Sequence, residues 1–196
     1  MTTTADASYE QGLRLSRQGR HAEAIDRYQA ALAAAPSDPR ILFALGNTAK
    51  SLDMRKPAEM FFRQVLALEP ERLEALINLA NLLRSNGDAA AARDLLTPAL
   101  ARNLDAPELW LTLGSAYRAL NDSDAAIEHY RRALELKSNY AAALANLADM
   151  ICQRGETDEA LSFYDRALRA EPDNAQAKLN RAILLLLTGD LKRGWR

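Results

Sequence analysis

Large and small apolar residues recur along the chain with a period of 34 residues. When residue 5 is taken as position 1, position 20 is alanine in every complete repeat, position 8 is glycine or alanine, and position 24 is large. A fixed period of this kind is the sequence signature of stacked repeats. The pattern predicts five repeats, over residues 5–38, 39–72, 73–106, 107–140 and 141–174, followed by a partial repeat over residues 175–196.

Each repeat contains two apolar stripes with helical spacing, separated by a short break near position 15. The break carries residues that tolerate the left-handed backbone conformation in which many helices end. These residues are Gly19, Asp53, Gly87, Asn121, Gly155 and Gly189. The sequence therefore predicts twelve helices, the twelfth a stub, with the large residue at position 24 filling gaps left by small ones. Pro98 lies inside the second helix of the third repeat, where we expect a bend.

The fourth repeat carries the fullest version of the pattern, in Trp110, Leu113, Gly114, Tyr117, Ala126, Tyr130 and Ala133. On these residues the chain resembles the tetratricopeptide repeat (TPR) family from residue 5 to about residue 196. The resemblance implies an all-α, right-handed superhelical solenoid of antiparallel helix pairs. It also implies that the first helix of each pair lines a concave groove that holds a protein or peptide partner. Residues 1–4 are expected to be disordered.

The resemblance places positions 5, 6, 9 and 12 of the first helices in this groove. Position 5 is mostly apolar, positions 6 and 9 are mostly asparagine or another small polar residue in the middle and last repeats, and position 12 is basic in three consecutive repeats. An asparagine side chain both donates and accepts, which suits hydrogen bonds to the backbone of an extended peptide; alternatively, these residues only keep the groove hydrated. The basic residues favour an acidic stretch in the partner. The candidate partner-binding residues are Tyr9, Phe43, Asn47, Lys50, Ile77, Asn78, Asn81, Arg84, Leu111, Thr112, Ser115, Arg118, Asn146, Asp149 and Asn180.

Two further resemblances suggest an enzyme that this groove would serve. Residues 76–81 and 144–149 are similar to asparagine-bearing first helices of O-linked N-acetylglucosamine transferases, and Gly189-Asp190 with Gly194-Trp195 is similar to the last repeat of bacterial TPR proteins that continue into a glycosyltransferase. These resemblances imply the substrate-recruiting module of a bacterial protein O-glycosyltransferase, with flagellin or another surface protein as acceptor. The alternative is a free-standing adaptor or assembly scaffold without an enzymatic domain. The apolar run over residues 183–187 needs a cover, which we expect from a completed second helix and a following domain, or else from self-association through the C-terminal end.

Composition and charge exclude several other classes of function. The formal net charge is −1 and no apolar stretch approaches membrane-spanning length, so neither nucleic acid nor a membrane is an expected partner. The N-terminus lacks the features of a secretory signal, which favours a cytoplasmic location. His21 and His129 are predicted to face solvent, and Cys152 is predicted to be an inert thiol on the groove side. We therefore expect no catalytic residue, metal or cofactor in this chain, and no enzymatic activity from it alone.

Overall fold

The computed structural model describes residues 4–189, which form eleven α-helices and contain no strand. The helices are α1 (Thr4–Arg17), α2 (His21–Ala34), α3 (Pro39–Ser51), α4 (Arg55–Leu68), α5 (Leu73–Ser85), α6 (Ala89–Arg102), α7 (Pro107–Ala119), α8 (Ser123–Leu136), α9 (Ala141–Gln153), α10 (Thr157–Ala170) and α11 (Ala175–Leu187). The first helix already includes Thr4, a residue expected to be disordered. The predicted twelfth helix and the Gly194-Trp195 pair lie outside the described residues.

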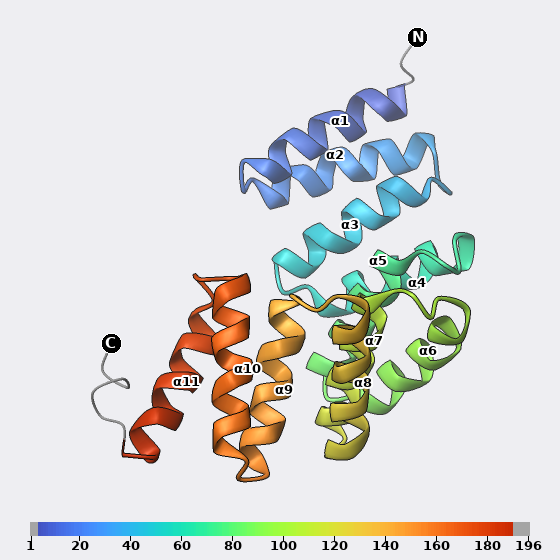
Figure 1. Cartoon of the computed structure of the whole chain (residues 1–196). Helices are drawn as coiled ribbons and strands as arrows, with labels where there is room; N and C mark the ends of the chain where they lie inside the picture. Colours follow the sequence, from blue (N-terminus) through green and yellow to red (C-terminus); the bar gives the residue numbers. More distant parts are fainter. Residues whose placement is uncertain (1–3, 190–196) are drawn as a thin grey trace. The chain divides into compact units, whose positions relative to one another are not determined.

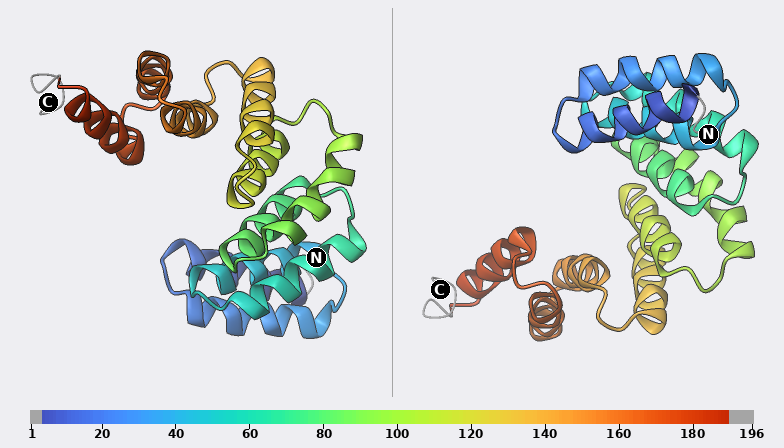
Figure 2. Two further views of the ribbon diagram at one scale, coloured as in Figure 1. Left: turned by 90° about the horizontal axis from the view of Figure 1, so that it is seen from below. Right: turned by 90° about the horizontal axis from the view of Figure 1, so that it is seen from above.

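The helices group into two compact units, one of residues up to Asp88 and one from Ala89 onwards. In the first unit, α1 pairs with α2, α3 pairs with α4, and α5 packs on α4 (Figure 1). In the second unit, α7 pairs with α8 and α9 pairs with α10, while α11 lies next to α10 in both views of Figure 2. The predicted helix pairs of repeats one, two, four and five are therefore confirmed, and the boundary between the units falls inside the third repeat.

The turns between paired helices have the predicted left-handed backbone. The six residues named for this position all have positive φ, including the non-glycine residues Asp53 (53°) and Asn121 (61°). After each of the first five turn residues, the next amide reaches back to the last helical turn, as when Asp122 donates to the carbonyl of Tyr117 at 3.0 Å. This bond satisfies a carbonyl that the end of the helix leaves without a partner. At the other end of a helix, Asp38 accepts from the amide of Arg40 at 2.9 Å and so caps α3.

The predicted large-against-small packing is present within the pairs. A Cβ atom added at Gly46 would lie 2.7 Å from the ring of Phe62, and one at Gly114 would lie 2.8 Å from the ring of Tyr130. Both rings are fully buried, as is Ala126. Glycine at position 8 therefore allows two helices to approach closely enough to bury an aromatic ring between them. The helix α6 runs without a break through Pro98.

Candidate partner-binding surface

The apolar residues at position 5 in the first unit are half-buried rather than free. Tyr9 and Phe43 pack against the buried core of their helix pairs, and Ile77 is half-buried on α5. The guanidinium of Arg40 lies 5.5 Å from the ring centre of Tyr9, and that of Arg72 lies 4.3 Å from the ring centre of Phe43. Tyr9 and Phe43 therefore contribute to the packing of the first unit. Each of these two aromatic rings contacts the core and also lies within cation–π distance of an arginine.

The polar residues of the first unit bond to one another between successive repeats. Asn78 on α5 donates from Nδ2 to Oδ1 of Asn47 on α3 at 3.1 Å, and its own Oδ1 accepts from Nζ of Lys50 at 2.7 Å. Asn78 is therefore a bridge between two first helices. These two asparagines therefore bond to each other and not only to water.

Lys50 and Arg84 are the position 12 cations of the first unit, and neither forms an ion pair within residues 4–189. Burial lowers the pKa of Lys50, although part of its side chain remains exposed. The Nε atom of Arg84 is buried and has no hydrogen-bond partner in the described structure. Asn81, one turn before Arg84, is half-buried. Lys50 on α3 already donates to Asn78, whereas Asn81 and Arg84 lie on α5.

In the second unit, an equivalent hydrogen bond joins successive repeats, but its acceptor is an aspartate in place of an asparagine. Asn180 on α11 donates to Oδ1 of Asp149 on α9 at 2.8 Å, as Asn78 does to Asn47. The same oxygen accepts the hydroxyl of Tyr164 on α10 at 2.5 Å, and Arg118 lies 3.6 Å from Oδ2. Burial, together with the hydrogen bond to the carboxylate, raises the pKa of Tyr164 well above its usual value. Both carboxylate oxygens of Asp149 therefore already have partners within the protein.

Two predicted groove residues are buried and belong to the interior. Thr112 and Ser115 are only 6% and 8% exposed. The Thr112 hydroxyl donates to the carbonyl of Glu108 at 2.7 Å, and that of Ser115 donates to the carbonyl of Leu111 at 3.0 Å. Their assignment to the partner surface is wrong because short hydroxyl side chains satisfy themselves on their own helix. Leu111 itself is partly buried against the core, while Asn146 is half-buried on α9.

The sequence pattern did not predict that tyrosine hydroxyls of the second helices donate to polar residues at position 9 of the first helices. Besides the Tyr164 bond, Tyr130 donates to the hydroxyl of Ser115 at 3.3 Å, again across 15 residues. These bonds could have been predicted from repeats that have a polar residue at position 9 and a tyrosine at position 24. Phe62 occupies position 24 in the second repeat and provides no such donor.

The histidines and the cysteine are more enclosed than predicted. His129 is half-buried, with its ring centre 4.9 Å from that of Tyr117 and 5.4 Å from that of Trp110, so its assignment to the solvent face is wrong. His21 is also half-buried. Cys152 is partly buried against the core of the second unit. Within residues 4–189 no cluster of histidine, cysteine, aspartate and glutamate could hold a metal ion.

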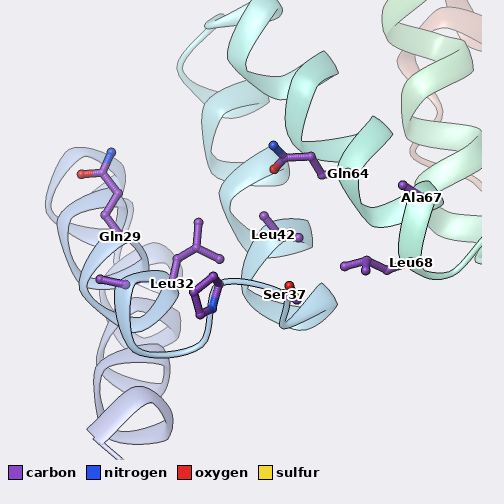
Figure 3. A pocket seen from close by; sticks show the side chains of 9 residues that line it. Gln29, Leu32, Ser37, Leu42, Gln64, Ala67 and Leu68 are labelled. Carbon is purple, nitrogen blue, oxygen red and sulfur yellow. The ribbon is translucent and has the colours of Figure 1, made fainter.

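A hollow whose lining residues include no asparagine lies among α2, α3 and α4 of the first unit (Figure 3). It has a volume of about 580 Å³ and a largely apolar lining that includes Leu32, Leu42 and Leu68. Gln29 and Gln64 are the polar side chains that Figure 3 shows from α2 and α4. The sequence gives no clear sign of this hollow, because its lining comes from small and apolar residues that also fit an ordinary core.

Profiles of the tetratricopeptide repeat match nearly the whole chain. One such profile matches residues 58–97, 77–141, 111–175 and 152–194, and others match residues 12–52 and 39–72. The chain therefore belongs to the tetratricopeptide repeat family. It is a TPR protein-interaction module, with helices that fit five repeats and the first helix of a sixth. None of the helices within residues 4–189 is long and apolar enough to cross a membrane.

Similarity to a named bacterial relative covers part of the chain. A segment of 87 residues is 36% identical to the probable biofilm formation methyltransferase WspC of Pseudomonas aeruginosa. This segment is 44% of the present chain and 21% of WspC, so the chain spans about a fifth of that relative.

Solved structures resemble the chain over most of its length. A thermophilic TPR protein of Thermus thermophilus has a TM-score of 0.74 and 26% identity, over 93% of this chain and 99% of that one. PilF of Pseudomonas aeruginosa has a TM-score of 0.82 and 22% identity, over 97% and 87% of the two chains. The similarity to PilF shows a shared fold and nothing more.

Proposed function

We propose that the groove side of the first helices binds an extended polypeptide through its asparagine amides. The observation that supports this proposal is the bridge from Asn47 to Asn78, because it fixes the orientation of both amides before any partner arrives. Each amide group has two donor hydrogens, and the bridge uses one of the two on Asn78. The remaining donors can pair with backbone carbonyls of a peptide at little further entropic cost.

The partner that we propose is a protein substrate of a glycosyltransferase, with flagellin or another surface protein as the acceptor. The support for this choice is the resemblance of residues 76–81 and 144–149 to the asparagine-bearing helices of O-linked N-acetylglucosamine transferases. In this proposal the TPR module recruits the acceptor, and a glycosyltransferase domain in the complete gene product transfers the sugar. The partial match to a protein named as a methyltransferase supports only the weaker idea that such repeats occur in enzymes.

A free-standing adaptor or assembly scaffold is the second candidate. The solved TPR protein of Thermus thermophilus supports it, because the present chain covers 99% of that chain without any extra domain. In this alternative the same groove holds a partner, but no enzyme acts on it.

Binding of purified flagellin by isothermal titration calorimetry tests the first proposal. The double variant Asn81→Ala, Asn146→Ala removes one half-buried amide from each unit, and we expect about tenfold weaker binding. The matched control is Asn139→Ala, which changes an exposed asparagine between α8 and α9. Unchanged affinity in the double variant would place the binding surface elsewhere.

The link to glycosylation needs a separate experiment with the complete gene product. We expect the 196-residue chain to bind flagellin without transferring sugar, and the complete product to transfer sugar to it. Flagellin that binds but receives no sugar from the complete product would exclude the glycosyltransferase and favour the adaptor.

A further inference from the structure

The hollow among α2, α3 and α4, called the α2–α4 hollow from here on, has no charged residue in its lining. Charged residues nevertheless make up 26% of the chain. Apart from Gln29, Ser37 and Gln64, the residues that line it in the described structure are apolar. Leu42 is only 3% exposed, whereas Leu68 is 46% exposed. The α2–α4 hollow is therefore an uncharged, largely apolar surface that the protein leaves open to solvent.

The same repeat positions are charged in the second unit. Two residues of α2 and two of α4 that line the hollow have charged counterparts in α8 and α10, three repeats later. In chain order, Gln29, Ala33, Gln64 and Ala67 correspond to Arg131, Glu135, Arg166 and Arg169. Both sets of repeats form the same helix pairs, so the fold does not require uncharged residues at these positions. The absence of charge is therefore a particular property of the α2–α4 hollow.

The α2–α4 hollow lies at the C-terminal ends of two helices. α2 ends at Ala34 and α4 ends at Leu68, and the lining includes residues from the last turn of each helix. The last carbonyls of a helix have no amide partner within that helix, and they carry the partial negative charge of the helix dipole. A bound anion is therefore unfavourable here, whereas a neutral hydrogen-bond donor is favourable.

Gln29 and Gln64 add neutral hydrogen-bonding groups from the two helices that flank the hollow. In Figure 3, Leu32 lies between these two glutamines. An amide side chain both donates and accepts, so it can hold a hydroxyl or amide group of a ligand without any charge. A cationic ligand would find no carboxylate among the lining residues, and withdrawing an unpaired charge from water is costly.

The size of the α2–α4 hollow suits a small molecule. Its volume of about 580 Å³ and its apolar lining with a few polar groups are typical of small-molecule sites. Leu42 at the start of α3 and the turn residues Pro36 and Ser37 line it together with the two flanking helices. The hollow is thus bounded by three helices and a turn.

We propose that the α2–α4 hollow binds a small uncharged molecule that has an apolar body and one amide or hydroxyl group. A medium-chain fatty acid amide is a representative of this class. The apolar body packs on Leu32, Leu42 and Leu68, and the polar group bonds to Gln29, Gln64 or the last carbonyls of the flanking helices. The site uses none of the asparagines to which the proposed function assigns the polypeptide.

Methyl resonances of the 196-residue chain in nuclear magnetic resonance spectra test this inference. The probe is octanamide, and octanoate is its matched anionic control. We expect octanamide to shift the methyl resonances of Leu32, Leu42 and Leu68 with a Kd of about 1 mM or below. Octanoate should bind at least about tenfold more weakly, because its carboxylate would lie beside two helix C-termini.

Variants that copy the second unit identify the site. Ala33→Glu and Ala67→Arg introduce the residues found at positions 135 and 169, and each should weaken octanamide binding by about tenfold or more. Both alanines are exposed, so we expect the variants to fold, and circular dichroism verifies this. The matched controls are Ala22→Glu and Ala170→Arg, at exposed positions of α2 and α10 outside the hollow, and they should leave binding unchanged.

Several outcomes would overturn the inference without affecting the proposed peptide surface. One is the absence of any methyl shift with octanamide at about 1 mM. Another is an equal shift of Leu134 and Leu144, the counterparts of Leu32 and Leu42 in the second unit, because binding would then not depend on the uncharged lining. Tighter binding of octanoate or octylamine than of octanamide would overturn the choice of an uncharged ligand. A leucine-bearing helical peptide that binds where octanamide does not would show that the hollow receives a partner helix instead.

Discussion

Asn78 donates a hydrogen bond to the side-chain oxygen of Asn47, 31 residues earlier in the chain. Asn180 donates to Asp149 across the same separation of 31 residues, in the second unit. The shared geometry indicates that position 9 of one repeat and position 6 of the next are coupled partners. The asparagines of this surface therefore stabilise the stacking of repeats in addition to any role in binding.

The first prediction concerns the stability contributed by this coupling. Asn78→Ala removes a donor to Asn47 and an acceptor for Lys50, so we expect the free energy of unfolding to fall by about 0.5–1.5 kcal/mol. Urea unfolding of Asn78→Ala, Asn47→Ala and the double variant measures the coupling between the two amides. Additive effects in the double variant would mean that the bond contributes nothing to stability.

The second prediction concerns Tyr164 and alkaline pH. Its pKa is raised in the folded state, so the neutral phenol is favoured there. The associated stability is fully present below the pKa of the unfolded chain, about 10, and is lost as pH rises above that value towards the folded pKa. We expect urea unfolding midpoints to fall between about pH 9 and about pH 11, and to fall less steeply in Tyr164→Phe.

At neutral pH the same Tyr164→Phe variant should already be less stable than the parent chain, by about 1.5–3 kcal/mol, because Asp149 loses a donor. Tyr140→Phe is the control. Burial also raises the pKa of Tyr140, but no carboxylate accepts its hydroxyl in the described structure. Identical pH profiles for the parent and Tyr164→Phe would show that the phenol does not control alkaline unfolding.

The third prediction tests the register of the repeats. Ala126 is fully buried in the core of the second unit, where it lies among the residues of α8, α9 and their neighbours. Ala126→Leu should overpack this site and lower the free energy of unfolding by about 1–3 kcal/mol. Ala119→Leu, at an exposed position on α7, should leave it nearly unchanged. Equal melting temperatures for Ala126→Leu and the parent chain would contradict the register.

Most of the fold follows from local features that recur in the sequence. Gly46 and Gly114 are spaced so that an aromatic ring 16 positions later can pack on them, and this spacing alone identifies the helix pairs. Asp53 and Asn121 stand where glycine stands in other repeats, and both adopt the left-handed conformation. Such positions are predictable because their requirements are steric and confined to one repeat.

The partner surface was predictable only in part, because its details depend on contacts between repeats. The periodicity predicted Asn47 and Asn78 for the same side of successive first helices, but it did not reveal that they bond to each other. It also assigned Thr112 and Ser115 to the surface, although both are buried with hydroxyls bonded to their own helix. Position within a repeat indicates the face of a helix, whereas exposure depends on how deeply the neighbouring helices cover it.

The last prediction concerns the C-terminal helix. The sequence suggested that residues 183–187 need a cover, but Leu184 and Leu185 are buried within the second unit. The exposed apolar face of α11 instead consists of Leu179 (55% exposed), Ile183 (46%) and Leu187 (79%). These residues are spaced four apart and form one stripe along the helix. We expect this stripe to mediate association of two copies at high protein concentration, since burying a leucine side chain contributes about 1.5–3 kcal/mol.

Sedimentation equilibrium across a range of concentrations measures this association. Leu179→Glu combined with Ile183→Glu places charges in the stripe and should keep the chain monomeric, because a buried carboxylate without a partner is unfavourable. The matched control is Met60→Glu, which changes a similarly exposed apolar residue (48%) on α4 and should leave association intact. Both variants should unfold at nearly the same temperature as the parent, since the three side chains are exposed in the single chain. A parent chain that stays monomeric at every concentration, or a Met60→Glu variant that loses association as fully as the double variant, would show that the α11 stripe is not the contact.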